Sequence, residues 1–250
     1  MLVLSIRWFG ENTKINKEAV VQVVLQRMWF DTTNSNKNSC TINVKINTMD
    51  FSDNRTWYEK YVQDRSYFAY LRGLLSRYIS YIKNERIVNI ARRNGAIIGT
   101  GVIMPKSLAK KLNSNVIIGN HVSIETDKID TRAKLVIGNN VIIGRESEII
   151  TVSHNIDSPD WEPKYYGLEI QDYVWIPTKV LVLPSCRIIG MGGVISSGSV
   201  VVKSVEPMTV VSGNPAKELR KRACVHADLP VERLLHGDYK QFKDTYKKKK

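Results

Sequence analysis

From about residue 95 to residue 212, aliphatic side chains recur every six residues. These positions, often followed by Gly, are Ile98, Ile118, Ile124, Ile137, Ile143, Ile149, Ile170, Ile176, Val182, Ile189, Ile195 and Val201. A small residue recurs four places after several of them, at Val141, Ser147, Val174, Val180 and Ser199. A fixed repeat predicts a stacked solenoid, in which no unit buries its apolar face alone. Hexads are typical of parallel β-helices, so we predict a mainly β fold with three short faces per rung and the aliphatic side chains inside.

The six-residue spacing is interrupted at four places. Pro105–Asn115 and Thr126–Lys134 are insertions, and the longest break is a loop over residues 151–169. The step from Val182 to Ile189 is one residue too long, and a bulge near Ser185-Cys186 is predicted to absorb it. Loops that leave a solenoid often carry function, so the long loop is the first place to look for chemistry.

Residues 1–94 form a predicted extension of different character. Between residues 57 and 93, apolar side chains recur at helical spacing, at Phe68, Leu71, Leu75, Tyr78, Ile79 and Ile82. This pattern predicts one amphipathic helix or a helical pair that ends at Asn94-Gly95 and packs against the next domain or another subunit. Earlier in the chain, Ala19–Phe30 reads as a helix or a buried strand, and Thr41–Asn47 as a short strand. Residues 213–250 read as a turn at Gly213–Lys217, a short helix and a basic tail.

The composition of the 250-residue chain, 43% hydrophobic and 24% charged, is that of an ordinary soluble protein. No apolar run approaches the ~18 residues of a membrane span, and the N-terminus does not read as a signal peptide. Cys40, Cys186 and Cys224 lie far apart, which disfavours a disulfide framework or a cysteine metal site. We therefore expect a protein of the reducing cytoplasm.

The formal net charge is +13, and much of it lies near the C-terminus. We expect Lys247–Lys250 to be a solvated, disordered tail, with an anionic partner as the alternative. No helix-turn-helix, RNP or zinc-finger signature supports nucleic acid as that partner. Contact of the tail with a membrane surface has only the charge in its favour.

His154 is the principal candidate for catalysis, because it lies at the start of the long loop. A histidine accepts a proton from a hydroxyl near neutral pH, since its ordinary pKa is ~6.5. The coil contains only two histidines, His121 and His154, 33 positions apart, so we expect no metal site.

The loop after His154 holds further candidates. Asp157 and Asp160 are expected to orient the imidazole or hold an acceptor, or else simply to form turns. Trp161, Tyr165 and Tyr166 offer flat faces on which sugars or bases stack, or else they anchor the loop. Trp175 lies between two inward positions, so its side chain is expected to face outward on a binding surface.

In combination, these motifs resemble the hexapeptide-repeat acyltransferases, and most closely the bacterial sugar O-acetyltransferases of the colanic acid, maltose, galactoside and nodulation type. The matching stretches are IIGNHVSI, VIGNNVIIGRESEIITVSHNID, IQDYVWIPTKVLVLP, GGVISSGSVVVKSV and VVSGNPAKELRKR. They cover about half of the chain, from Ile97 to Arg222.

The resemblance implies a left-handed β-helix, a homotrimer and acetyl-CoA in a groove between neighbouring coils. It implies that His154 is the general base, that Trp175 lies near the reactive centre, and that the Thr178 N–H meets the thioester carbonyl. It also implies that Ser197 pairs with pantetheine through its backbone. Three cations match positions near the CoA phosphates, namely Lys203, Lys217 and Arg220. Two residues depart from the family pattern, because Pro177 and Ser196 stand where glycines are usual.

The function implied is transfer of an acetyl group to a hydroxyl of a saccharide or small molecule, in surface polysaccharide biosynthesis. Asp157, Trp161 and Tyr165 are the expected acceptor-binding residues. Two alternatives stay open: acylation of an amino sugar on nitrogen, and a catalytically silent β-helix used for assembly.

Overall fold

The computed structural model describes residues 55–226 and 231–249. The expected elements at Ala19–Phe30 and Thr41–Asn47 lie outside these residues, as does Cys40. None of the described helices has the length and apolar character needed to cross a bilayer.

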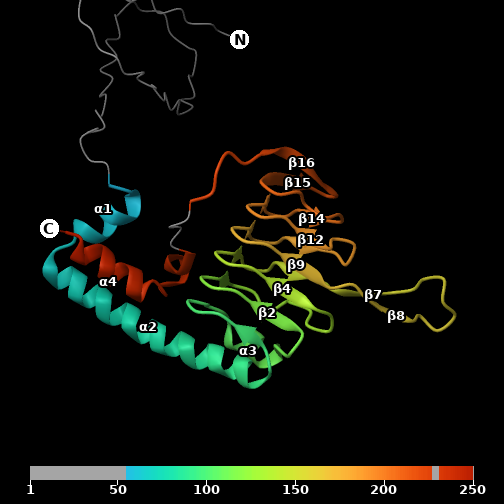
Figure 1. Cartoon of the computed structure of the whole chain (residues 1–250), viewed down its shortest axis with the longest axis horizontal. Coiled ribbons are helices and arrows are strands. Elements are labelled where there is room, and N and C mark those ends of the chain that lie inside the picture. Colours follow the sequence, from blue (N-terminus) through green and yellow to red (C-terminus); the bar gives the residue numbers. More distant parts are fainter. Residues whose placement is uncertain (1–54, 227–230, 250) are drawn as a thin grey trace, which may run out of the picture. The chain divides into compact units, whose positions relative to one another are not determined.

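Most of the short strands in residues 97–213 pass in turn through three sheets, in which they pair in parallel, and Figure 1 shows them as stacked rungs. The first sheet contains β1 (Ile97–Ile98), β2 (Val116–Ile118), β4 (Leu135–Ile137), β9 (Leu168–Ile170) and β12 (Ile188–Ile189), in that order. The second contains β3 (Ser123–Ile124), β5 (Ile142–Ile143), β10 (Trp175–Ile176), β13 (Val194–Ile195), β15 (Thr209–Gly213) and β16 (Ala216–Lys221). The third contains β6 (Glu148–Ile149), β11 (Leu181–Val182) and β14 (Val200–Val201). This connectivity is that expected of a parallel β-helix.

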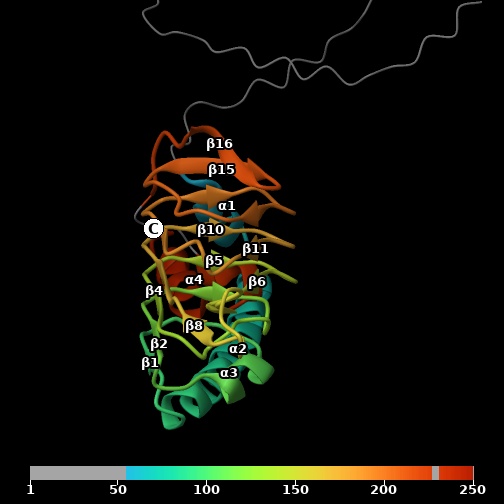
Figure 2. The same cartoon turned by 90° about the vertical axis from the view of Figure 1, so that its right-hand side faces the viewer.

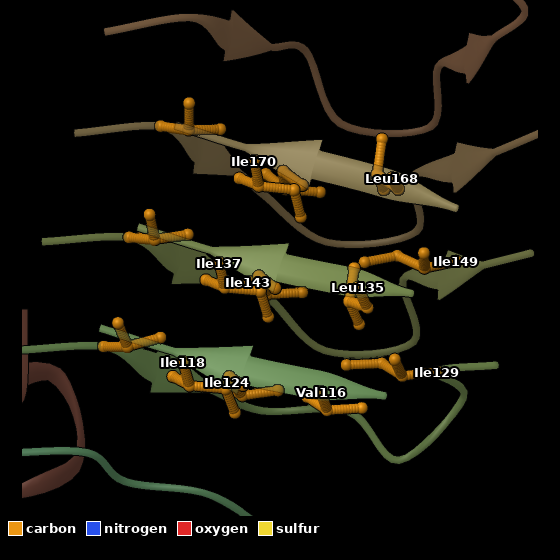
Figure 3. Packing of buried hydrophobic residues seen from close by; sticks show 14 of the residues in the cluster. Val116, Ile118, Ile124, Ile129, Leu135, Ile137, Ile143, Ile149, Leu168 and Ile170 are labelled. Carbon is orange, nitrogen blue, oxygen red and sulfur yellow. The ribbon is translucent and has the colours of Figure 1, made fainter. Parts of the chain in front are cut away.

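The predicted inward positions form the core. All twelve aliphatic residues of the six-residue repeat are buried, and those of successive rungs stack on one another (Figure 3). The five small residues four places later are buried as well, at the corners where the chain turns into the next sheet. The prediction of a mainly β fold with an aliphatic interior is confirmed, because the burial follows the hexad spacing position by position.

Two interruptions take a different form from the one predicted. Thr126–Lys134 is not simply ejected, because Ile129 is buried and bridges to Ile149 in the stack. The extra residue between Val182 and Ile189 lies in the turn closed by the Cys186 N–H, which donates to the Leu183 carbonyl at 2.9 Å. Pro105–Asn115 contains the short helix α3 (Lys106–Lys111).

The helical pattern before the coil is a pair of helices, α1 (Trp57–Gln63) and α2 (Tyr67–Arg93). Each begins with a side-chain cap: Thr56 accepts from the Glu59 N–H, and Ser66 accepts from the Ala69 N–H. The C-terminal segment returns to this pair through the 3₁₀ helix η1 (Val231–Leu235) and α4 (Tyr239–Lys247). Phe242 of α4 is fully buried against Tyr70 of α2.

The basic helix expected directly after Gly213–Lys217 is absent there, and the α-helix of this segment is α4. Ala216–Lys221 is the strand β16, which turns back and pairs antiparallel with β15. This segment forms a strand because β15 would otherwise be the edge of its sheet. Pairing with β16 gives hydrogen-bond partners to backbone groups of β15 that a helix would leave unpaired. The tail also differs from the prediction, because Lys247 ends α4 and the Lys249 ammonium donates to the Arg65 carbonyl at 3.3 Å.

Candidate functional site

His154 lies on a hairpin that projects from the coil (Figures 1 and 2). The hairpin is formed by β7 (Val152–His154) and β8 (Pro163–Tyr165), which pair antiparallel and place His154 opposite Pro163. The side chain of Val152 is buried at the base, whereas His154 is exposed farther out. The long loop therefore holds the histidine on a regular element rather than on irregular backbone.

One hydrogen bond fixes the chemical form of the His154 ring. Its Nδ1 lies 2.6 Å from the backbone carbonyl oxygen of Trp161. A carbonyl oxygen only accepts, so we assign the proton to Nδ1. In the neutral ring the lone pair is then on Nε2. This is the form that a general base requires, with the second ring nitrogen held by an orienting partner.

The hairpin carries the predicted acceptor-binding side chains, with Asp157 and Trp161 in the loop at its tip and Tyr165 opposite Val152 near its base. Asp157, Trp161 and Tyr165 are all exposed, and the rings of Trp161 and His154 are 6.3 Å apart edge to face. Asp160 does not orient the imidazole. Its carboxylate accepts a hydrogen bond from the Ser158 hydroxyl, which holds the pKa of Asp160 below its ordinary value. Tyr166 is half-buried, and the guanidinium of Arg187 lies 5.4 Å from its ring centre.

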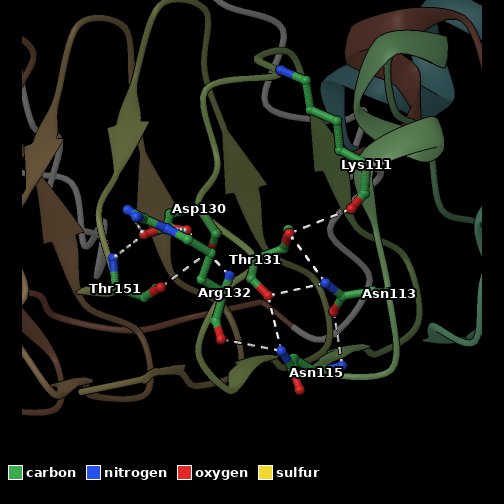
Figure 4. Close-up of polar contacts among 7 residues, drawn as sticks. All are labelled: Lys111, Asn113, Asn115, Asp130, Thr131, Arg132 and Thr151. Atoms are coloured by element: carbon green, nitrogen blue, oxygen red, sulfur yellow. Dashed lines mark hydrogen bonds and ion pairs between the residues drawn. The ribbon is translucent and has the colours of Figure 1, made fainter. Parts of the chain in front are cut away.

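The base of the hairpin is fixed by Asp130, a residue that the sequence patterns did not single out. Its carboxylate accepts two side-chain hydrogen bonds from Arg132, at 2.9 Å each, and one from the Thr151 N–H at 3.3 Å (Figure 4). Burial alone raises the pKa of Asp130, but the hydrogen bonds from Arg132 and Thr151 outweigh it and lower this pKa below its ordinary value. The only sequence signal for this anchor is its place in the insertion Thr126–Lys134.

The residues predicted to bind the acyl donor lie mainly along the second sheet. Trp175 begins β10 with about half of its surface exposed, which confirms that it faces outward. Across the second sheet, Trp175 pairs with Val194, Val194 pairs with Val210, and Val210 pairs with Arg220 of β16. Three strand-to-strand steps cover about 14 Å. Lys217 lies on the same strand as Arg220, and both side chains are exposed. Lys203 is exposed just after β14, in the turn that leaves the third sheet.

Thr178 and Ser197 occupy equivalent positions in successive rungs. The register of Trp175 with Val194 places Thr178 beside Ser197, and the Gly198 N–H donates to the Thr178 carbonyl at 3.2 Å. The extra residue before Ile189 therefore leaves this register intact. Within residues 55–226 and 231–249, the backbone N–H groups of Thr178 and Ser197 have no acceptor. Both donors are thus available to a bound molecule.

The structure does not bring His154 and Thr178 together in one chain. The hairpin leaves the coil between the third and first sheets, whereas Thr178 follows the second sheet at another corner. No contact joins the hairpin tip to Trp175, Thr178 or Ser197 in the part of the chain that the structure describes. The same described residues contain no group of three or more His, Cys, Asp or Glu side chains placed to hold a metal ion.

No family model matches the chain. It is 41% identical over 95 residues to an acetyltransferase-named protein of Schizosaccharomyces pombe, a match that covers 36% of this chain and 44% of that one. It is 29% identical over 134 residues to a colanic acid biosynthesis acetyltransferase of Escherichia coli, covering 53% and 73%. The chain spans about half the length of the first curated relatives it matches. These similarities confirm the resemblance to hexapeptide-repeat acetyltransferases.

Among solved structures, the coil is similar to a hexapeptide-repeat acetyltransferase from Vibrio cholerae, crystallised with acetyl coenzyme A. The TM-score is 0.47 and the identity is 24%, with 69% of this chain and 93% of that chain covered.

Proposed function

Because the chain is similar in sequence to proteins named as acetyltransferases, one of them of colanic acid biosynthesis, we propose that this protein is an acetyl-CoA-dependent O-acetyltransferase. Its acceptor is a hydroxyl of a sugar or saccharide, and surface polysaccharide biosynthesis is the setting the resemblance favours. The coil is a left-handed β-helix, and the active form is a homotrimer. The observation that carries the proposal is the hydrogen bond from His154 Nδ1 to the Trp161 carbonyl.

His154 acts as the general base. Acetyl-CoA supplies the acetyl group as an activated thioester. Nε2 of His154 accepts the proton of the acceptor hydroxyl as its oxygen attacks, and returns that proton to the departing thiolate. The Trp161 carbonyl stabilises the imidazolium, because its oxygen accepts the hydrogen bond from the Nδ1–H of His154 at every step of the reaction.

The free backbone N–H groups of Thr178 and Ser197, which follow strands of the second sheet, fit the binding of the acyl donor. The Thr178 N–H donates to the thioester oxygen as negative charge develops on it, since a fixed donor there costs no reorganisation. The Ser197 N–H, one rung farther, holds the pantetheine arm. Lys217, Arg220 and Lys203 supply positive charge for the phosphates, and the strand register places Arg220 in line with Trp175.

Each active site takes residues from two subunits. His154 and Thr178 leave one coil at different corners, so a groove between neighbouring coils is where the hairpin of one subunit meets the second sheet of the next. Asp157, Trp161 and Tyr165 then line the acceptor side, where the exposed rings offer stacking faces to a sugar.

The direct test is acetyl transfer by His154→Ala, measured as CoA thiol release with a panel of saccharides. We expect kcat to fall by about 10²–10⁴, the usual contribution of a general base. Binding of acetyl-CoA, measured by calorimetry, stays unchanged because His154 is on the acceptor side.

The matched control is His226→Ala, which removes an exposed histidine from outside the coil. It should turn over at the wild-type rate. Full activity of His154→Ala would remove this residue from the mechanism, and absence of acetyl-CoA binding by the folded wild type would refute the transferase proposal.

A further inference from the structure

Helix α2 carries apolar side chains on two faces, one buried and the other largely exposed. Tyr70, Arg77, Val88 and Ala91 are buried on the inner face. The outer face, which we call the α2 stripe, consists of Phe68, Leu71, Leu75, Tyr78, Ile79 and Ile82. Within it, the Tyr78 ring lies 5.3 Å from the ring of Tyr239 of α4, and Ile82 is half-buried. Phe68 is 83% exposed, Leu75 61% and Ile79 60%. Residues three and four apart share one side of a helix, so the stripe is continuous over about 21 Å.

Cations lie on the same face as the stripe. Arg72, Lys83 and Arg86 each follow an apolar residue of the stripe by four positions, which places them on its side of the helix. Among residues 55–226 and 231–249, no carboxylate pairs with any of these three. From residue 55 to residue 93 there are nine Lys and Arg residues against three Asp and Glu residues. The face is therefore both apolar and strongly positive.

The C-terminal half of the stripe opens into a groove of about 710 Å³ beside α3. Its walls include Ile79, Ile82 and Ile90, and its rim holds Lys83, Arg86 and Lys106. Lys106 is exposed and also has no ion-pair partner in the described segments. An apolar floor under a rim of ammonium and guanidinium groups fits a molecule that has hydrocarbon below and anionic groups above.

We propose that the α2 stripe is a docking surface for an anionic lipid membrane. The apolar side chains enter the acyl boundary, while Arg72, Lys83, Arg86 and Lys106 contact lipid phosphates. Exposed aromatic rings at the start of the helix, Tyr67 and Phe68, are of the kind that favours the membrane–water interface. The helix lies on the surface, since no described helix is apolar enough to cross a bilayer.

The charges favour a lipid surface over a second copy of the same helix. A symmetric contact between two α2 stripes brings Arg72, Lys83 and Arg86 of both copies together. Glu85 of α2 is already paired with Arg92 at 3.5 Å, and Glu125, which lines a pocket together with Lys83, is paired with Arg145 at 2.8 Å. Like charges at a contact are unfavourable. A bilayer rich in anionic headgroups satisfies all these cations at once.

The test is co-sedimentation of the full chain with phosphatidylcholine vesicles, with and without phosphatidylglycerol. We expect binding only to the anionic vesicles, weakened by salt. Lys83→Gln and Arg86→Gln should each weaken binding about fivefold, the value of one cation near an anionic surface. Phe68→Ser with Ile79→Ser should weaken it more than about tenfold, because both lose buried apolar area.

The matched controls lie on the coil. Ile188→Ser with Met191→Ser removes exposed apolar side chains elsewhere, and Lys134→Gln removes an exposed cation. These controls should bind vesicles like the wild type. Failure of the full chain to bind anionic vesicles overturns the proposal. The proposal is also overturned if a stripe variant binds vesicles like the wild type but has a smaller oligomer mass in light scattering. That outcome would assign the stripe to a contact between copies of the chain.

Discussion

At the scale of single residues, burial separates the two described cysteines chemically. Cys186 is buried inside the coil, where desolvation raises the pKa of its thiol to about 11, and Cys224 is exposed. Because the thiolate is the reactive form, alkylation of the native protein should modify Cys224 and spare Cys186. Peptide mapping after iodoacetamide treatment checks this, with urea-unfolded protein as the control in which both react. Labelling of Cys186 at the same rate as Cys224 would contradict the buried position.

Asp130 makes a residue-scale prediction with a defined pH dependence. Its carboxylate has a folded-state pKa below the ordinary value of about 3.9, so it stabilises the fold above that pH. This stability is lost as the pH falls through the folded-state pKa. Asp130→Asn should therefore cost about 1 kcal/mol at neutral pH, a value kept small because Arg132 is largely exposed, and little in acid.

Urea unfolding at pH 7 and at successively lower pH, down to the lowest pH at which the protein stays folded, measures this difference. Asp157→Asn, an exposed carboxylate on the same hairpin, is the matched control and should change stability at neither pH. An unfolding difference for Asp130→Asn that persists undiminished in acid would show that shape, not charge, anchors the hairpin.

At the scale of elements, the close spacing between neighbouring rungs fixes the position of the Thr178 N–H. A Cβ added at Gly144 would lie 2.8 Å from the Pro177 carbonyl carbon and from the Thr178 nitrogen of the next rung. Real Cβ atoms do not approach backbone so closely, so Gly144→Ala must displace the Thr178 N–H. We expect a loss of turnover larger than the loss of stability explains, because an oxyanion donor is worth about 10²–10³ in kcat.

Gly119→Ala is the matched control for Gly144→Ala. Its Cβ would meet the Gly138 carbonyl at 2.7 Å, a similar clash at a different corner with no predicted site residue. Thermal unfolding should show similar losses for the two variants, while only Gly144→Ala loses turnover. Equal turnover in the two variants would mean that the Thr178 N–H does not act as the oxyanion donor.

The edge strand β16 gives a second prediction at this scale. Lys217→Ala and Arg220→Ala should each weaken CoA binding up to about fivefold, since exposed ion pairs contribute up to about 1 kcal/mol. Calorimetry with CoA and dephospho-CoA separates phosphate contacts from general charge, because the ligand without the 3′-phosphate should lose less. Lys164→Ala on the hairpin is the control cation and should bind both ligands normally.

Sequence patterns predicted the coil much better than its attachments, for a physical reason. The aliphatic residue of each hexad has one possible direction in a rung, so Ile143 or Ile195 is assigned to the core from spacing alone. Lys217–Lys221 has no such constraint, because its conformation depends on the open edge of β15. Asp130 acts through Thr151, a partner 21 positions away, and such a contact has no local signature.

At the scale of the whole molecule, a buried ion pair joins the two ends of the described chain. Arg77 of α2 donates to Asp238 at 2.8 Å with both side chains buried, and the Tyr58 hydroxyl donates to the same carboxylate at 2.7 Å. Burial and this carboxylate raise the pKa of Tyr58 well above its ordinary value. Asp238→Ala should destabilise the protein by about 3–5 kcal/mol, because it leaves Arg77 buried without its partner.

Chemical unfolding measures this effect, and Asp244→Asn on the exposed side of α4 is the control. Tyr58→Phe should cost only about 0.5–1.5 kcal/mol, since it removes one hydrogen bond and leaves the ion pair. Stability of Asp238→Ala within error of the control would mean that α4 is not fixed to α2 by this pair.

The division of the proposed site between two coils is the prediction with the greatest reach. His154→Ala removes the base from one side, and Thr178→Pro removes the backbone donor from the other. Each variant alone should be nearly inactive. In mixed trimers, an interface that takes its hairpin from the Thr178→Pro subunit and its second sheet from the His154→Ala subunit has both groups intact.

Co-expression of the two variants with different affinity tags, followed by purification through both tags, gives such mixed trimers. Each trimer that contains both variants has one intact interface of three, so the activity of the purified mixed trimers should return to about a third of wild type. A control co-expression of two His154→Ala chains should stay inactive. If the mixed trimers are also inactive although each variant is folded and trimeric, the base and the donor belong to one chain, because no interface then restores the pair.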